Sequence, residues 1–315
     1  MNEALATLLG PPAGYVFALV WGAVWGSFYN VVIVFGEGRR ASLVRPGSHC
    51  LACGTPIRFY DNIPILSYLI LRGRCRACGA RFSPRYVIVE VLAALLAVAL
   101  YWRFVVADVL GAPFVMRLAW FLVYEKLAGL LLVLSAIDLT TLLIPDKITY
   151  PSIPVMAALS LLLPLPRWWD GLVGAVAGYA VIWIIAEVYY LVRRREGMGL
   201  GDAKLLAMIG AALGWRALPF VIFLASLQGS VLGIVGLLTG ARLPAGLPED
   251  EPTPAPPEAP PATAAPAAAA APAAPAPAAS LRFAAIPFGP FLAVAALEYL
   301  FLAQVLRHYL AFFWL

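Results

Sequence analysis

Charged residues are scarce in this chain of 315 residues, where Asp, Glu, Lys and Arg together make up 12% of the sequence. A folded soluble domain carries about 25% charged residues, so the composition excludes an ordinary soluble protein. Hydrophobic residues make up 63% of the chain, and their runs recur from end to end, each near the ~20 residues that cross a bilayer. The sequence therefore predicts an all-α polytopic membrane protein embedded in a lipid bilayer.

Several familiar signals are also missing. The sequence contains no glycine-rich nucleotide fingerprint and no internal repeat. The first apolar run, residues 15–35, has no basic residue before it and no small-residue cleavage site of the usual kind, so we interpret it as a retained span rather than a removable signal. The net charge of +5 could suggest nucleic acid, but the basic residues cluster in a few loops between spans. That bias is the positive-inside pattern, and no nucleic-acid partner is expected.

The apolar runs predict about eight membrane spans. They lie at 14–36, 86–107, 117–137, 148–165, 171–192, 204–216, 218–240 and 286–313. The sixth is short for a span. With an external N-terminus, the arginine-rich loops fall on the cytoplasmic side of the membrane. The apolar run 63–71 is too short to span, so it lies at the interface or re-enters the membrane.

The composition of the segments gives a division into five parts. They are a first span at 1–36, a cytoplasmic polar domain at 37–84, a transmembrane core at 85–240, a disordered linker at 241–282 and a last span at 283–315. The linker is almost entirely Pro and Ala, which favours extended, solvated chain.

All four cysteines lie in the polar segment 37–84 and form two Cys-x-x-Cys-Gly knuckles, Cys50/Cys53 and Cys75/Cys78, with 21 residues between them. This spacing is typical of a four-cysteine zinc site. A disulfide or redox pair is the alternative, but the cytoplasmic location disfavours disulfides. Four thiolates leave no open position for a catalytic water, so the zinc is expected to be structural. His49 could substitute as a ligand, although a surface histidine is commoner.

Two acids at the predicted membrane edge are candidates for catalysis. Asp202 lies in Gly199-Leu200-Gly201-Asp202-Ala203-Lys204, and Asp138 ends a span. The alternative for Asp202 is a flexible turn with an incidental aspartate. Two acids at one depth on different helices can meet, and a close pair cannot both ionise, so one proton is shared. Such a pair activates water against a peptide carbonyl without a metal.

Other acids are interpreted differently. Asp146 precedes Lys147 near a helix start and is favoured as a helix-end acid. The acids within apolar segments are more often structural than catalytic; they are Glu90, Glu125, Glu187 and Glu298. A proton-coupled transporter using Glu90, Glu187 and Glu298 is a rival hypothesis. It predicts paired broken helices in related halves, which the sequence does not contain.

Taken together, these motifs resemble the bacterial type IV prepilin peptidases, the GxGD-type aspartyl leader peptidases. The matching segments are Gly26–Val32, the two knuckles with Tyr60–Pro64 between them, Ser83–Tyr86, Asp138 with Pro145-Asp146, Gly199–Lys204 and Ile286–Phe291. Val87, where relatives often have proline, and the long Pro/Ala segment depart from the family pattern.

The resemblance implies that Asp138 and Asp202 are the catalytic pair. It implies cleavage of prepilins and pseudopilins after a glycine that ends a short basic leader, at the cytoplasmic face of the bacterial inner membrane. Many members then N-methylate the new first residue with S-adenosylmethionine, an activity associated with the cysteine domain. A peptidase without methyl transfer is the alternative, because no methyl-donor fingerprint is visible.

The remaining site residues have supporting roles in this hypothesis. Gly199 and Gly201 let the substrate strand approach Asp202 closely. Lys204 tunes the acid pair or contacts backbone carbonyls of the substrate. Asp61 and Asp146 are the acidic groups expected to receive the positive charge of the leader.

Overall fold

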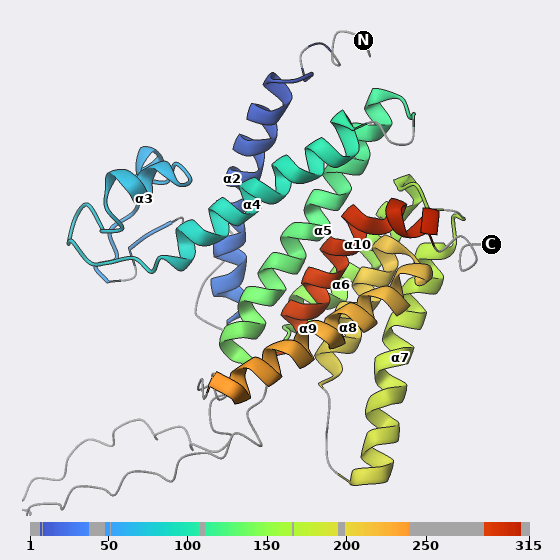
Figure 1. Ribbon diagram of the computed structural model, residues 1–315. Helices are drawn as coiled ribbons and strands as arrows, with labels where there is room; N and C mark the ends of the chain where they lie inside the picture. The colour runs from blue at the N-terminus through green and yellow to red at the C-terminus, as the bar shows by residue number, and fades with distance from the viewer. Residues whose placement is uncertain are drawn as a thin grey trace, which may run out of the picture. The chain divides into compact units, whose positions relative to one another are not determined.

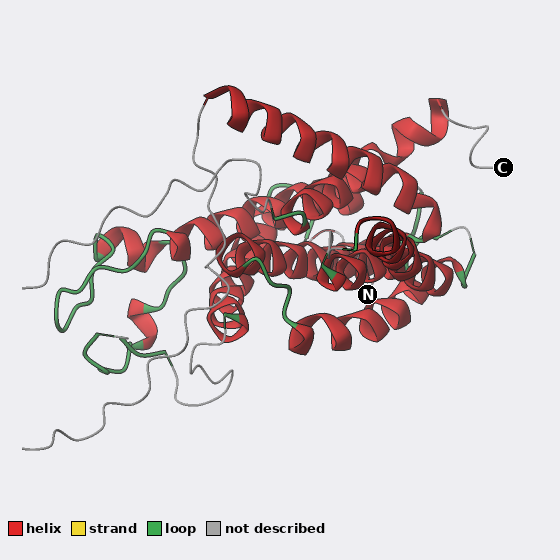
Figure 2. Cartoon of the chain, turned by 90° about the horizontal axis from the view of Figure 1, so that it is seen from below, coloured by secondary structure: helices red, strands yellow, loops and turns green. Residues whose placement is uncertain are grey.

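The protein is described by a computed structural model that covers residues 7, 9–37, 48–50, 52–107, 111–165, 167–194, 199–239 and 287–309, without the side chains of 237 and 303–309. Within these ranges the chain forms helices joined by loops (Figure 2), with two isolated bridges as the only β pairing. The predicted linker at 241–282 lies outside the described residues. Contacts divide the chain into two units, residues 1–229 with 287–315, and residues 230–286.

Nine α-helices are described (Figure 1). They are α2 (Ala13–Gly36), α3 (Leu66–Ile70), α4 (Arg85–Tyr101), α5 (Phe114–Thr141), α6 (Asp146–Leu159), α7 (Asp170–Arg193), α8 (Leu200–Leu213), α9 (Leu218–Thr239) and α10 (Gly289–Tyr309). A π-helical turn, Trp102–Val106, extends α4. Short 3-10 turns occur at Phe59–Asp61, Ser160–Leu162 and Trp215–Ala217.

The prediction of an all-α membrane protein is confirmed, whereas the number of spans is not. Five described helical segments are long and apolar enough to cross a membrane: Ala13–Gly36, Arg85–Val106, Phe114–Thr141, Asp170–Arg193 and Trp215–Gly236. α6 and α8 have 14 residues each, about 21 Å at 1.5 Å per residue, which is shorter than the ~30 Å hydrocarbon core. The apolar part of α10 with described side chains, Gly289–Leu302, is also short. The total of eight therefore stays a prediction.

The helices alternate in direction, as consecutive membrane spans must. One end of the bundle collects the C-terminal ends of α2 and α5 and the N-terminal ends of α4, α6, α8 and α10. The contacts that establish this are Arg85–Glu37, Lys204–Asp146 and Gly289–Asp138. At the opposite end, the indole Nε1 of Trp120 in α5 donates to the carbonyl of Leu162 after α6 at 2.8 Å. All the residues predicted to form the active site thus belong to one end of the bundle, apart from Asp61 in the segment between α2 and α4.

Small residues bring two helix pairs into close contact. A Cβ at Gly22 of α2 would lie 2.6 Å from the Ala93 carbonyl oxygen of α4, and a Cβ at Gly174 of α7 would overlap the backbone of Gly210 in α8. Small side chains at such crossings let membrane helices approach closely and gain van der Waals contact. Larger residues at these glycines would separate the helices.

α5 is the most buried of the five candidate spans. It lies between α4 and α10 (Figure 1) and also contacts α2 and α8. Because several helices surround it, a polar side chain at the end of α5 meets groups from distant parts of the sequence. That end carries Asp138.

Candidate functional site

Asp138 is held by the start of the last helix. Its residue is only 5% exposed, and its Oδ2 accepts the backbone N–H of Gly289 at 3.0 Å. Gly289 is the first residue of α10. The first N–H groups of a helix have no partner within the helix, and the helix dipole favours a negative charge there. The start of α10 is therefore a built-in donor for an ionised Asp138.

Asp202 reaches the same place from the first turn of α8, where it is half-buried. Its backbone N–H donates to the carbonyl of Gly199 at 3.2 Å, and Gly199 itself has an extended backbone, with φ −71° and ψ 138°. The carboxyl group of Asp202 lies within the electrostatic field of Asp138. α5 and α8 are in contact, which supports the predicted pairing of the two acids, and the pairing itself stays a prediction.

Ile144, in the turn between α5 and α6, packs against both halves of this site. A Cβ at Gly201 would lie 3.0 Å from the Ile144 Cβ, and a Cβ at Gly289 would lie 3.5 Å from the Ile144 Cδ1. Gly201 directly precedes Asp202 in the sequence, and Gly289 donates a hydrogen bond to Asp138. A larger residue at either position would push the helix start away from Ile144 and separate the two carboxyl groups.

The described partners of Lys204 are Asp146 and Tyr150 of α6. Its ammonium group forms an ion pair with the Asp146 carboxylate, and its Nζ lies 4.7 Å from the centre of the Tyr150 ring. The ion pair joins the first turn of α8 to the first turn of α6. Lys204 therefore fixes the helix that carries Asp202, while tuning of the acid pair by its charge stays a prediction.

The two acids predicted to receive the basic leader each have a cationic partner within the chain. The Asp61 carboxylate accepts hydrogen bonds from two nitrogens of Arg76, with Nη2 to Oδ1 at 2.6 Å and Nε to Oδ2 at 2.8 Å. These hydrogen bonds hold the pKa of Asp61 below its usual value. Asp146 binds Lys204, although its side chain is 59% exposed. Contact between either acid and a substrate leader stays a prediction.

The two cysteine knuckles have the same local structure. In the first, the N–H of Gly54 donates to the carbonyl of Cys50 at 2.8 Å; in the second, the N–H of Gly79 donates to the carbonyl of Cys75 at 2.9 Å. Both glycines have φ +71°, a conformation that favours glycine because it has no Cβ. An isolated bridge closes each knuckle, His49 with Pro56 and Arg74 with Arg81. The two knuckles thus share one local structure as well as one sequence motif.

The four sulfur atoms have the spacing of a tetrahedral metal site. All four lie within 4.8 Å of one another, and the Sγ atoms of Cys50 and Cys78 are 3.8 Å apart. Bonds of about 2.3 Å from zinc to sulfur require sulfur atoms about 3.8 Å apart in a tetrahedron. All four cysteines are free thiols, and His49 is not part of the cluster. The donor set fits one structural zinc ion.

The pKa values of two of the thiols are shifted in opposite directions, as expected for sulfur atoms that lie close together. Hydrogen bonds with the side chain and then the backbone of Thr55 lower the pKa of Cys53 to about 6. The N–H of Ala80 lowers the pKa of Cys78, but the thiol of Cys53, loss of solvent and the thiol of Cys75 outweigh it and raise the pKa to about 11. Neighbouring thiols thus compete for negative charge, and a divalent cation would remove this competition.

Three of the four acids in apolar helices have structural partners. Glu90 accepts the N–H of Ile65 at 2.7 Å, which fastens the start of α3 to α4. The others are Glu125, which accepts the Tyr29 hydroxyl at 3.2 Å and pairs with Lys126, and Glu298, which accepts the Gln228 amide at 2.6 Å. Glu187 is exposed on α7. The described contacts favour structural roles for Glu90 and Glu125, which are buried, and for Glu298, which is half-buried.

Gly289 and Ile144 are site residues that the sequence did not identify as such. The motif Ile286–Phe291 was part of the resemblance, but nothing local indicates that its helix start points at Asp138. The available signal was Pro290 after Gly289, because proline is favoured in the first turn of a helix, where free N–H groups are exposed. Ile144 carries no signal beyond its position between Asp138 and Asp146.

We expect Gly289→Ala to lower peptidase activity strongly. A Cβ at Gly289 would lie 2.6 Å from the Asp138 Oδ2, so either α10 or the carboxyl group must move. A displacement of about 1 Å can cost on the order of 10²-fold in rate. Cleavage of a prepilin peptide measures the loss. Gly229→Ala is the matched control, since its Cβ would make only ordinary contacts, at 3.5 Å and beyond; equal rates for both variants would contradict the assigned geometry.

Two family descriptions match this chain. The family description "Bacterial Peptidase A24 N-terminal domain" matches residues 20–104, and "Type IV leader peptidase family" matches residues 126–234. The chain is similar to the prepilin leader peptidase/N-methyltransferase of Pseudomonas putida, at 38% identity over 248 residues, 71% of this chain and 81% of the relative.

Two further relatives carry the same description. The protein of Aeromonas hydrophila is 39% identical over 214 residues, 68% of this chain and 70% of the relative. That of Neisseria gonorrhoeae is 36% identical over 250 residues, 71% of this chain and 82% of the relative. No solved structure matches this chain. The family matches and these identities establish that the chain belongs to the type IV leader peptidase family.

Proposed function

We propose that this protein is a membrane aspartyl endopeptidase that removes the basic leader of type IV prepilins and pseudopilins after a glycine. The observation that carries the proposal is that Asp138 at the end of α5 and Asp202 at the start of α8 belong to one end of the bundle, where these two helices are in contact. The relatives are named prepilin leader peptidases, which supports the same reaction here. A proton-coupled transporter receives no support from the family matches or from the contacts of Glu90 and Glu298.

In this proposal the two carboxyl groups share one proton. The proton starts on Asp202, because the N–H of Gly289 stabilises the ionised form of Asp138. Asp138 takes a proton from water as the water oxygen attacks the carbonyl carbon of the leader glycine, and Asp202 donates its proton to the carbonyl oxygen. The roles then reverse: the amide nitrogen receives a proton, the C–N bond breaks, and the carboxylic acid and the amine leave.

We further propose that Cys50, Cys53, Cys75 and Cys78 hold one structural zinc ion. Their sulfur atoms are spaced for a tetrahedron, and four thiolates leave no position for water or substrate. The zinc then organises the segment between α2 and α4 and takes no part in hydrolysis.

The proposed location is the bacterial inner membrane, with the N-terminus external and the acid pair at the cytoplasmic face. The arginines of the segment between α2 and α4 favour this orientation. We also propose that the chain is divided at 36, 84, 240 and 282 into the five parts predicted from the sequence. α3 is placed at the membrane surface, because Glu90 fixes its start to α4 and Leu66, Leu69 and Ile70 are exposed on it.

N-methylation of the new first residue with S-adenosylmethionine is the second proposed activity, because the relatives are named N-methyltransferases as well as peptidases. The described residues contain no strand followed by a glycine-rich loop and a helix, so they do not form the common dinucleotide-type fold. No step of methyl transfer is therefore assigned to particular residues. A peptidase without methyl transfer stays the alternative.

Incubation of the purified protein with a prepilin peptide tests both activities. We expect two products, cut after the leader glycine, and, with S-adenosylmethionine present, a mature fragment heavier by one methylene group in the mass spectrum. Cleavage without this mass change would select the alternative. An intact peptide under conditions where the protein stays folded in detergent would refute the proposed function.

A further inference from the structure

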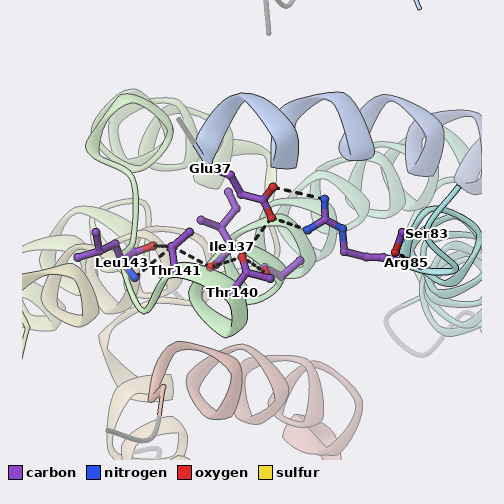
Figure 3. A network of polar contacts seen from close by, with 8 residues as sticks. Glu37, Ser83, Arg85, Ile137, Thr140, Thr141 and Leu143 are labelled. Atoms are coloured by element: carbon purple, nitrogen blue, oxygen red, sulfur yellow. Dashed lines mark hydrogen bonds and ion pairs between the residues drawn. The ribbon is translucent and has the colours of Figure 1, made fainter. Parts of the chain in front are cut away.

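The segment between α2 and α4, which contains the cysteine knuckles, begins and ends at one ion pair. Glu37 directly follows α2, and Arg85 is the first residue of α4. The Arg85 guanidinium contacts both carboxylate oxygens of Glu37 (Figure 3), with Nη2 to Oε2 at 3.4 Å. The side chain of Glu37 is 5% exposed and that of Arg85 is 26% exposed. The pair is largely withdrawn from water, where a fork-shaped guanidinium gives it a defined geometry.

The same carboxylate reaches the end of α5. The hydroxyl Oγ1 of Thr140 lies 3.1 Å from the Oε1 of Glu37 (Figure 3). The Thr140 hydroxyl is also 2.9 Å from the carbonyl of Ile137, and its single hydrogen is donated to one acceptor at a time. Thr140 follows Asp138 by two residues. The ion pair is thus connected to the last turn of the helix that carries Asp138.

A second contact between α2 and α5 involves Ile137, the residue directly before Asp138. A Cβ at Gly36, the last residue of α2, would overlap the Cδ1 of Ile137. The end of α2 therefore packs directly on the residue before Asp138 and, through Glu37, binds the second residue after it. The α5 helix stops immediately beyond, where the N–H of Leu142 returns to the carbonyl of Asp138 at 2.9 Å and Leu142 has φ 54°.

These contacts matter because a carboxyl group at a helix end needs support from more than one direction. Gly289 fixes the Oδ2 of Asp138 from α10. Nothing in that hydrogen bond prevents the last turn of α5 from rotating or fraying, and catalytic groups must be held within about 0.5 Å of their working geometry. Glu37 and Gly36 supply the contact from the opposite element, α2.

We propose that Glu37, Arg85 and Thr140 form a positioning network that holds the end of α5 so that Asp138 meets Asp202. The inference rests on the proposed peptidase function. In this role Arg85 fixes the carboxylate of Glu37, Glu37 accepts the hydrogen bond of Thr140, and Thr140 fixes the turn that contains Asp138. This positioning role requires no contact between the three residues and the substrate.

A double-mutant cycle on the full-length protein in detergent tests the network. The variants are Thr140→Val, which removes only the hydroxyl, Glu37→Gln, which removes the charge, and the two together. Each single variant is expected to lower kcat for a prepilin peptide by about tenfold with an unchanged KM, since small displacements of a catalytic group act on the chemical step. The double variant should be no slower than the slower single variant, because Glu37→Gln weakens and Thr140→Val removes the same link between Glu37 and Thr140. Thr140→Ser should restore kcat.

Ser83→Ala is the matched control. The Ser83 hydroxyl accepts the N–H of Arg85 at 3.3 Å, so it belongs to the same base of α4 (Figure 3) but has no described contact with α5. Its kcat should equal that of the unchanged protein. Additive losses in the cycle, or a change in KM alone, would overturn the proposal. Thr140→Val is nearly isosteric, so the hydroxyl can be tested even if Glu37→Gln fails to fold.

Hydrogen exchange separates this inference from the proposed function. The N–H of Leu142, which bonds the carbonyl of Asp138, should exchange faster in Thr140→Val and in Glu37→Gln than in Ser83→Ala. This measurement needs no substrate. Unchanged exchange at the end of α5 would refute the network even if the protein cleaves prepilin, whereas faster exchange in a protein that cleaves no peptide would leave the network standing and refute the peptidase.

Discussion

Asp138→Asn and Asp202→Asn are each expected to abolish measurable cleavage of a prepilin peptide. An amide can neither take a proton from water nor give one to the carbonyl oxygen, and each of these transfers contributes about 10²–10⁴-fold in rate. Either variant alone should therefore lower the cleavage rate by at least about 10²-fold. The rate of product formation, measured by mass spectrometry with purified protein in detergent, gives the loss directly.

The losses of cleavage rate from the two Asp→Asn changes should not be additive. Removing both should cost little more than removing one, because groups that share one proton do not contribute independently. This non-additivity distinguishes a true pair from two acids that each add a separate electrostatic effect, for which the losses would multiply.

Glu187→Gln is the control for both variants. Glu187 is an acid in a candidate span, as Asp138 is, but it is exposed on α7. Its replacement should leave cleavage unchanged. Retained cleavage in Asp202→Asn, with the variant folded in the membrane, would sink the assignment of the pair. Loss of cleavage in Glu187→Gln would instead revive a role for the acids of the apolar helices.

Loss of the cysteine cluster is expected to have the second large effect. Purified protein should contain about one equivalent of zinc, and the double variant Cys75→Ser with Cys78→Ser should contain none. Structural zinc in small domains contributes about 10–16 kcal/mol of binding free energy, which is folding free energy for the segment it organises. The segment has no helix longer than the five residues of α3 among its described residues, so it has little other support.

Limited proteolysis can show where the structure is lost. Trypsin should cut the double variant at the exposed arginines of this segment, Arg58, Arg72, Arg74, Arg76 and Arg81, and leave the helices of the bundle intact. His49→Ala is the control, because His49 adjoins Cys50 but lies outside the cluster; it should keep its zinc and its resistance to trypsin. Metal-free purified protein with an intact segment would refute the zinc site.

The sequence predicted the helices well because apolar runs of membrane length leave few alternatives to a helix. It placed the start of one helix wrongly. The predicted span at 204–216 begins after Asp202, whereas α8 begins at Leu200 and includes Gly201 and Asp202. Glycine has low helix propensity, which favoured a turn. In the structure, the contact of Gly201 with Ile144 outweighs that propensity.

Partners distant in sequence could not be predicted in the same way. Pairing of Asp138 with Asp202 is inferred from their equal depth, and it stays a prediction that the contact of α5 with α8 supports. The N–H of Gly289 at Asp138 and the ion pair of Lys204 with Asp146 depend on how α10 and α6 pack. Close contacts between helices, such as that of Gly174 in α7 with Gly210 in α8, leave no periodic signal in the sequence.

The ion pair of Glu37 with Arg85 has a consequence for the engineering of this chain. Because the two ends of the inserted segment meet side by side, a short turn could connect α2 directly to α4 without moving either helix. Besides the chain itself, the described contacts of the cysteine segment with the bundle then reduce to the bond of Ile65 with Glu90. We expect a chain in which a short turn replaces the segment to keep the order of the helices that carry the two acids.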